Sequence, residues 1–137
     1  MSVTNQYLEK GKELKPIGEN LSKIKRMDDS NVIPKLKEVS FKIACDVTNH
    51  IYGENGATDV YASQKGTSKD EREVLDKCLS SFSKIIDNHF NIESKSIEGG
   101  GAAGGLGIGS LIFLNGQLTS GIELIKEIAN FDQNIKN

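Results

Sequence analysis

The sequence predicts a single domain of mixed α and β structure. Three features lead to this expectation: an alternating apolar segment at 39–45 typical of a strand, an apolar stripe at helical spacing over 74–90, and a second helix start at Ser120. The 137 residues amount to one domain. A chain of this length buries roughly two thirds of its unfolded surface, so a core is expected without stabilising disulfides or metals.

The N-terminal segment is polar and is interrupted by glycines and prolines. Short extended segments are expected at 6–8 and 13–14, joined at Lys10-Gly11. A short helix is expected near 19–25. This segment therefore contributes small elements to the fold.

The middle of the chain combines a strand with turn-forming residues. Residues 39–45 alternate apolar with polar or small side chains, which predicts a strand with a buried face that runs into a loop at Asp46. Asn55-Gly56 is a strong turn sequence. A second short strand is expected after this turn, at 59–62.

The second half of the chain is expected to be mainly helical. Ser68 and Glu71 have the spacing of a capping box, and the apolar residues after them recur every three or four positions. This stripe consists of Val74, Leu75, Cys78, Leu79, Phe82, Ile85, Ile86 and Phe90. A further helical segment is expected over about 104–114, and Ser120 and Glu123 form a second box that opens a third helix. The residues that this third helix is expected to bury are Ile122, Leu124, Ile125 and Ile128.

Residues 99–109 contain seven glycines among eleven residues. Such a segment predicts close approach to a ligand or to another backbone, or turns with positive φ. Gly99, Gly101 and Gly104 have the Gly-x-Gly-x-x-Gly spacing, but 94–98 lacks the buried strand that a dinucleotide-binding turn requires. Two interpretations stay open: a loop that binds a phosphate or carboxylate through backbone N–H groups, and a tight helix–sheet contact without a ligand.

Three polar residues are candidates for ligand contact. Asp46 follows the predicted strand and Asn49 lies three residues beyond it, at a strand end where binding residues gather. A carboxylate there suits Mg²⁺ or accepts a hydroxyl proton, and the alternative is an Asx turn that closes the strand. Lys65 precedes a helix N-terminus, where a bound anion would relieve its unfavourable charge; the alternative is a solvated loop lysine.

Composition and charge exclude several classes of function. The formal net charge is −2 with both signs interleaved, which argues against a nucleic-acid partner. The sequence lacks an apolar run near 18 residues and a signal peptide, so neither a membrane nor export is expected. Cys45 and Cys78 are interpreted as small buried hydrophobes in a reducing cytoplasm. His50 and His89 lack partners at the spacing of a metal site or a catalytic triad.

Four ordered blocks of the sequence resemble the middle of the bacterial type I glycerate kinases, with matching spacings. The blocks are Ala44-Cys45-Asp46-Val47-Thr48-Asn49, Gly53-Glu54-Asn55-Gly56-Ala57, Gln64-Lys65-Gly66 and residues 99–107. Residues 11–14 and 18–21 are similar too, so the resemblance covers nearly the whole chain.

The resemblance implies that residues 1–137 form the second α/β domain, which that family inserts into a Rossmann-like domain. We therefore expect a fragment of a longer enzyme, inactive alone, with the missing Rossmann-like domain as its partner. The family reaction transfers the γ-phosphoryl group of ATP to a hydroxyl of D-glycerate with Mg²⁺. Neither ATP nor Mg²⁺ is expected to bind tightly to this chain alone.

The resemblance also implies roles for individual residues. Asp46 would be the catalytic, metal-facing or hydroxyl-facing carboxylate, and Asn49 its substrate-binding neighbour. Gln64 and Lys65 would line the cleft and neutralise the substrate anion. The glycines expected to let the backbone approach the ligand are Gly100, Gly101, Gly104 and Gly105. The residues do not say which of these positions contact glycerate and which contact ATP.

Two departures from the family pattern and two rival functions complete the sequence-based expectations. The family usually has proline where this chain has His50 and Ser63, so the two loops are expected to be less rigid.

One rival function is that of a stand-alone module that binds a small carboxylate or sugar acid without phosphoryl transfer. The other is a structural remnant that forms a homodimer through the surface of the missing domain. The sequence does not distinguish a 2-phosphoglycerate from a 3-phosphoglycerate product.

Overall fold

The computed structural model describes residues 6–9, 12–15, 17–62 and 66–131. The strands are β1 (Gln6–Glu9), β2 (Lys12–Glu13), β3 (Arg26–Asp28), β4 (Lys42–Ala44) and β5 (Gln117–Thr119), and the helices are α1 (Lys69–Phe90), α2 (Ala102–Phe113) and α3 (Gly121–Ile128). Short 3₁₀-helices occupy Gly18–Lys23, Pro34–Glu38 and Ser94–Ser96, and a π-helix occupies Thr58–Ala62. The mixed α and β class predicted from the sequence is confirmed.

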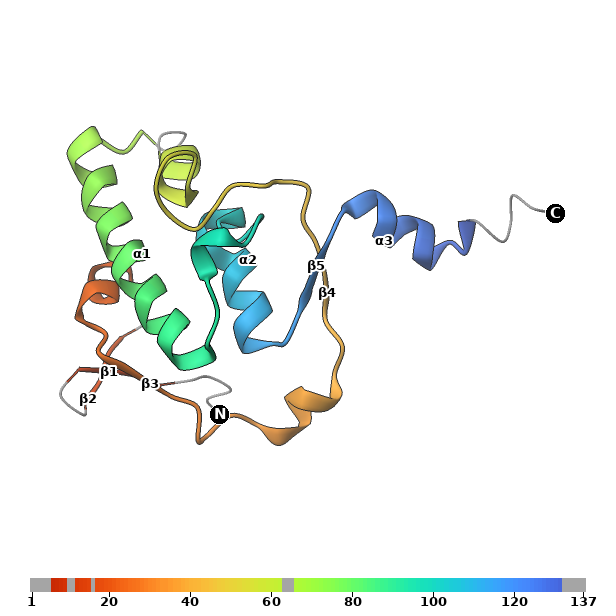
Figure 1. The fold of residues 1–137 in the computed structure, drawn as a ribbon, viewed down its shortest axis with the longest axis horizontal. Coiled ribbons are helices and arrows are strands. Elements are labelled where there is room, and N and C mark those ends of the chain that lie inside the picture. The colour runs from red at the N-terminus through yellow and green to blue at the C-terminus, as the bar shows by residue number, and fades with distance from the viewer. Residues whose placement is uncertain (1–5, 10–11, 16, 63–65, 132–137) are drawn as a thin grey trace.

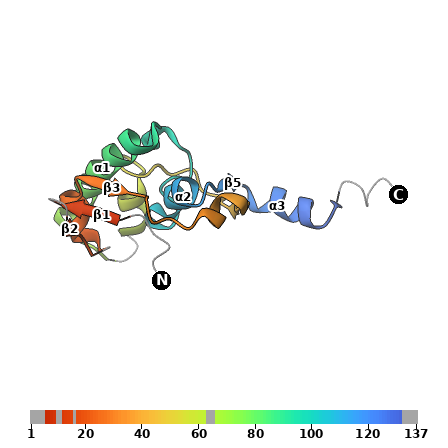
Figure 2. The same cartoon turned by 90° about the horizontal axis from the view of Figure 1, so that it is seen from below.

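The strands form two separate sheets with α1 and α2 between them (Figure 1). In the first sheet β1 pairs antiparallel with β2 and β3, which confirms the extended segments expected at 6–8 and 13–14. Lys10 and Gly11, expected to join them, lie outside the described residues. In the second sheet β4 and β5 run parallel, with Lys42 opposite Gln117. Figure 2 shows α3 extending away from the remainder of the fold.

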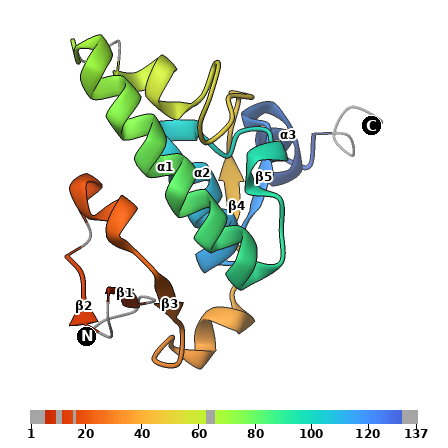
Figure 3. The same cartoon turned by 60° about the vertical axis from the view of Figure 1, so that its left-hand side comes forward.

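The core lies between α1 and the N-terminal segment. Ile24, Met27, Phe82 and Ile86 form one buried cluster, in which Ile86 is 0% exposed. The cluster joins the C-terminal half of α1 to the 3₁₀-helix Gly18–Lys23 and to β3, which lie against it in Figure 3. Burial of these apolar side chains is the main force that holds the N-terminal segment against α1.

The apolar stripe of α1 is only partly buried. The helix expected for this stripe is confirmed, and Cys78, Phe82 and Ile86 are buried, whereas Val74 is 59% exposed and Leu75 is 36% exposed. The physical reason is that the core cluster covers only the later turns of α1.

The capping box at the start of α1 is confirmed. The Ser68 hydroxyl accepts a hydrogen bond from the Glu71 backbone N–H, and the Glu71 carboxylate accepts one from the Ser68 N–H at 2.9 Å. The hydrogen bond from the Ser68 hydroxyl, followed by that from its backbone N–H, lowers the pKa of Glu71 from its ordinary value. Local sequence alone thus determines where this helix begins.

The strand predicted at 59–62 is wrong, because this segment is the π-helix Thr58–Ala62. The turn before it is present: Asn55 has a φ of 58°, and the Gly56 N–H donates to the Gly53 carbonyl at 2.9 Å. The Val60 N–H then donates to the Gly56 carbonyl at 3.1 Å. Hydrogen bonding is therefore satisfied within the segment rather than by a neighbouring strand.

The strand expected at 39–45 is confirmed over Lys42–Ala44, with Ile43 half-buried between the exposed Lys42 and Ala44. The burial predicted for the last helix is wrong. In α3 the helix itself is confirmed, but Ile122, Ile125 and Ile128 are 58%, 63% and 74% exposed. Both elements lie at the side of the molecule where the described chain provides few neighbours (Figure 1).

Candidate functional site

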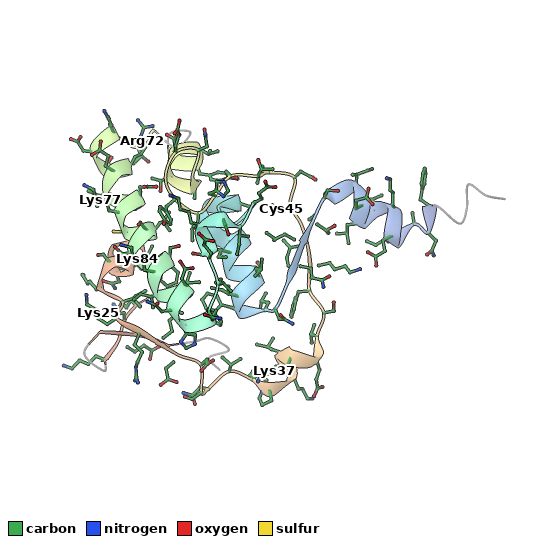
Figure 4. All side chains as sticks on the ribbon, viewed as in Figure 1. Lys25, Lys37, Cys45, Arg72, Lys77 and Lys84 are labelled. Carbon is green, nitrogen blue, oxygen red and sulfur yellow. The ribbon has the colours of Figure 1, made fainter. Side chains whose placement is uncertain are left out.

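The loop that follows β4 (residues 45–57) meets the glycine run (residues 99–105). The Gly101 N–H donates to the Asn49 carbonyl at 3.0 Å, and the Cys45 sulfur lies 4.0 Å from the Gly99 carbonyl oxygen. A Cβ on Gly101 would lie 2.0 Å from the His50 carbonyl oxygen, and one on Gly99 would lie 2.8 Å from the Cys45 sulfur. Two of the four blocks that resemble glycerate kinases are therefore in direct contact, and only glycine fits at 99 and 101. Figure 4 shows Cys45 where the chain leaves β4.

The glycine run has a tightly packed half and an open half. Ala103, Gly104 and Gly105 have φ values of 51°, 78° and 102°, so the regular part of α2 follows them. A Cβ on Gly104 or Gly105 would meet no atom within 4 Å among the described residues. Glycine is favoured at these two positions by backbone conformation rather than by crowding.

The backbone N–H groups of the glycine run are largely engaged within the protein. The N–H groups of Gly104 and Gly105 donate to the Gly101 carbonyl at 3.0 and 3.2 Å, and the Gly100 N–H donates to the Ile97 carbonyl at 3.1 Å. A ligand at this run would therefore approach the open Cα faces of Gly104 and Gly105. The close contacts at Gly99 and Gly101 match the second interpretation, a tight contact between segments, for this half of the run.

A small cavity lies beside the open half of the run. Its volume is about 290 Å³, and Gly104, Ala57, Thr58 and Gly18 are among the residues that line it. Thr58 is 5% exposed, and its hydroxyl has no hydrogen-bond partner among the described residues. The cavity thus gathers segments that are far apart in the sequence and that resemble glycerate kinases. Thr58 is not among the residues that the sequence pattern indicates, although it directly follows the Gly53–Ala57 block.

A second concave region lies between α1 and the π-helix. It has a volume of about 510 Å³ and is lined by charged α1 residues of both signs, including Lys69, Arg72, Asp76 and Lys77. The Asp76 carboxylate accepts a hydrogen bond from the Gly53 N–H at 2.9 Å and so links the two walls of this concave region. Figure 4 labels Arg72 and Lys77 on the first turns of α1. The signal in the sequence was the charged spacing of three and four on α1, opposite the apolar stripe.

Asp46 and Asn49 lie on the same loop but contact different neighbours. The Asp46 Oδ1 accepts the backbone N–H of Gly121 at 2.8 Å, at the start of α3. A carboxylate at a helix N-terminus is electrostatically favourable. The Asn49 side chain instead faces Gly101: a Cβ there would lie 2.5 Å from its Nδ2. Both polar atoms of the Asn49 amide are buried and have no partner among the described residues.

Gln64 and Lys65 lie outside the described residues. Within the described residues, no group of three or more His, Cys, Asp and Glu side chains could hold a metal ion. The helices of this part of the chain are also too short or too polar to cross a membrane.

Comparison with known proteins supports one family. The model of the glycerate kinase family matches residues 4–137. The glycerate kinase of Halalkalibacterium halodurans is 42% identical over 125 residues, which cover 89% of this chain and 33% of that protein. Escherichia coli glycerate 2-kinase is 36% identical over 125 residues, covering 91% and 33%.

A solved structure shares the fold. A Salmonella typhimurium LT2 protein described as glycerate kinase 2 matches with a TM-score of 0.86 and 30% identity, over 91% of this chain and 34% of that one. The chain thus spans about one third of the length of the relatives it matches. Because the family model covers nearly all of the sequence, the chain belongs to the glycerate kinase family.

Proposed function

We propose that residues 1–137 are the inserted domain of an ATP-dependent glycerate kinase and supply one wall of its active site. The reaction would transfer the γ-phosphoryl group of ATP to a hydroxyl of D-glycerate in the cytoplasm. The observation that carries this proposal is the junction of the two loops, where the buried Asn49 amide has no partner among the described residues. Buried polar groups are normally hydrogen-bonded, so an unpartnered amide at a loop junction suits a polar ligand.

The residues at this junction fit Mg²⁺ and ATP only as part of a larger site. Mg²⁺ in kinases is commonly held by one or two carboxylates together with substrate phosphates and water. Asp46 offers one carboxylate, whose Oδ1 accepts the Gly121 N–H. A carboxylate has further acceptor positions, so Oδ2 would still accept a ligand or a proton. The Rossmann-like domain of a full-length glycerate kinase would supply the opposite wall and most contacts to the nucleotide.

Each predicted residue has a distinct part in the proposed mechanism. Phosphoryl transfer depends mainly on positioning and on neutralising charge. Asn49 would orient a hydroxyl of glycerate through its amide, and Asp46 would accept the hydroxyl proton at Oδ2 or face the Mg²⁺ ion that neutralises phosphate charge. Gln64 and Lys65 would bind the carboxylate of the substrate. The backbone would come closest to the ligand at Gly104 and Gly105, whose Cα faces are open, whereas Gly100 and Gly101 are packed against Ile97 and His50.

An amide-resolved NMR titration with D-glycerate and then with MgATP tests the proposal. We expect shifts at Asp46, Asn49 and residues 100–105, and their loss in Asn49→Ala. Asn88, an exposed residue of α1, provides the control Asn88→Ala, which should titrate like the wild type. A well-dispersed spectrum that neither ligand changes would contradict the proposal.

The same titration separates the rival functions. Binding of D-glycerate without any effect of MgATP would favour a small-carboxylate module. The chain alone is expected to form no ADP from ATP and glycerate. Turnover is expected only when the remaining part of a glycerate kinase is supplied, and its absence under that condition would count against the kinase.

A further inference from the structure

The helix α3 turns its apolar face away from the part of the protein it follows. At 100° per residue, Ile122, Ile125 and Ile128 fall on one half of the helix, and Glu123 and Glu127 on the other. The three isoleucines are the side chains that are 58–74% exposed. An amphipathic helix of a globular protein normally buries its apolar half, so this arrangement is reversed.

The polar half and the N-terminus of α3 contact the preceding chain. Glu127 forms an ion pair with Lys42 of β4, and the Gly121 N–H donates to the Asp46 carboxylate. These contacts hold the helix beside β4 while the isoleucines face outward. Figures 1 and 2 both show α3 projecting from the rest of the fold.

The sheet next to α3 is also incomplete. Among the described residues it consists of β4 and β5 alone, which leaves the outer edge of each strand without a partner strand. Lys42 and Ala44 of β4 are exposed. Parallel sheets are normally buried and covered on both faces, and an isolated pair of strands is only marginally stable. The helix and the sheet therefore lack neighbours on the same side of the molecule.

We propose that the face formed by Ile122, Ile125 and Ile128, together with the adjacent open edge of the β4–β5 pair, is a docking surface for the remaining two thirds of a glycerate kinase. The partner would supply an apolar surface for the helix and a parallel strand for the sheet. This identification rests on the proposed function, because the partner is the part that completes the kinase. The Asp46 carboxylate accepts a hydrogen bond from the N–H of Gly121, the first residue of α3. A partner docked on α3 would therefore lie next to this candidate carboxylate.

Two observations favour this occupant over a second copy of the chain. The chain matches 34% of the length of a solved relative with a TM-score of 0.86, so the same fold occurs there within a chain about three times as long. In a two-fold symmetric pair, identical edge strands meet antiparallel. Such pairing would add an antiparallel strand to the parallel pair of β4 and β5, whereas a strand from a different segment can continue the parallel order.

Hydrogen exchange of α3 tests the docking surface directly. The chain is compared with a chimera in which it replaces the matching third of the Halalkalibacterium halodurans glycerate kinase. Peptides from residues 121–131 are expected to exchange at least tenfold more slowly in the chimera, whereas peptides from α1 should exchange alike and report correct folding. Equal exchange of residues 121–131 in both proteins would overturn the proposal.

Matched variants make the test specific. Ile125→Glu should abolish the slower exchange in the chimera. Val74→Glu should retain it, because Val74 is an equally exposed aliphatic residue, 59% against 63%, on a helix outside the surface. If fast exchange of the α1 peptides shows that the chimera is unfolded, the remainder of the relative is instead added to residues 1–137 as a separate chain. Lack of protection of residues 121–131 in that mixture overturns the proposal.

Two further outcomes are decisive. Sedimentation that shows a stable dimer of the isolated chain, dissociated by Ile125→Glu, would assign the surface to a second copy and overturn the proposal. Slower exchange without any turnover of glycerate would support docking and reject the proposed kinase activity. Turnover of glycerate without slower exchange would support the kinase activity and reject the docking surface. The two proposals therefore fail separately.

Discussion

Gly101→Ala is expected to destabilise the protein because of where the new methyl group would lie. The Cβ would be 2.0 Å from the His50 carbonyl oxygen and 2.5 Å from Asn49 Nδ2. The His50 carbonyl accepts the Ala57 N–H at 2.9 Å, and the Gly101 N–H is bonded to the Asn49 carbonyl. The obstructing atom is thus backbone that is hydrogen-bonded in place, and both loops must shift by more than an ångström.

Two opposing effects determine how much Gly101→Ala lowers the free energy of unfolding. Overpacking costs about 1–3 kcal/mol, and contact with backbone places this case at the upper end. Replacing glycine also reduces the entropy of the unfolded chain, which offsets about 0.4–1 kcal/mol. We expect a net loss of about 2 kcal/mol in the free energy of unfolding, which a domain with about 5–15 kcal/mol tolerates.

Urea denaturation followed by circular dichroism measures this loss. With a slope of about 1–3 kcal/mol per molar urea, the midpoint should fall by about 1 M. Gly109→Ala is the matched control, because the nearest atom to its Cβ is a Phe113 ring carbon at 3.9 Å and alanine is the better helix residue by about 0.5–1 kcal/mol. A midpoint for Gly101→Ala at or above that of the wild type would refute the contact between the loops.

Three further predictions concern single contacts. The Ser83 and Ser94 hydroxyls are fully buried and hydrogen-bonded to each other, so Ser83→Ala should cost about 1–3 kcal/mol in urea titrations, and the double alanine variant should cost less than the sum of the two single changes. The pKa of Glu71 is lowered by its bonds from the Ser68 hydroxyl and N–H, so this stabilisation is present above the unfolded pKa of about 4.3 and is lost as the pH falls through the lower folded pKa. The melting temperature of Glu71→Gln should therefore fall less on acidification than that of the wild type. Ala103 has a φ of 51°, so Ala103→Gly should be neutral or stabilising by up to about 1 kcal/mol in the same urea assay, rather than destabilising as in a regular helix.

The parts of the fold that the sequence predicts correctly depend on local interactions. The Ser68 capping box needs only residues three apart, and the turn at Asn55-Gly56 needs only residues that tolerate positive φ. The start of α1 and the turn before the π-helix therefore follow from short stretches of chain. The 3₁₀-helix Gly18–Lys23 likewise lies close to the helix expected near 19–25.

Apart from the strand expected at 59–62, the incorrect predictions concern burial, which depends on neighbours rather than on the residue itself. Ile125 has the spacing of a buried helix face, yet it is 63% exposed, and the main contact of α3 with another described element is with β4 on its opposite side. Val74 is exposed for a similar reason at the other end of the fold. A periodic pattern shows that a face is apolar and does not show which part of the protein covers it.

The candidate site illustrates the same limit at the level of single residues. Glycine at 101 and glycine at 104 are identical in the sequence, but a Cβ at 101 would overlap backbone, whereas one at 104 would meet open space. Crowding explains the first glycine without any ligand. The second has a positive φ and lines the cavity beside Thr58, so its open face remains accessible. Crowding at 101 and backbone conformation at 104 account for glycine at the two positions, and the cavity beside Gly104 is open space at the run. The functional argument therefore rests on the open half of the run and on the unpartnered Asn49 amide, not on the number of glycines.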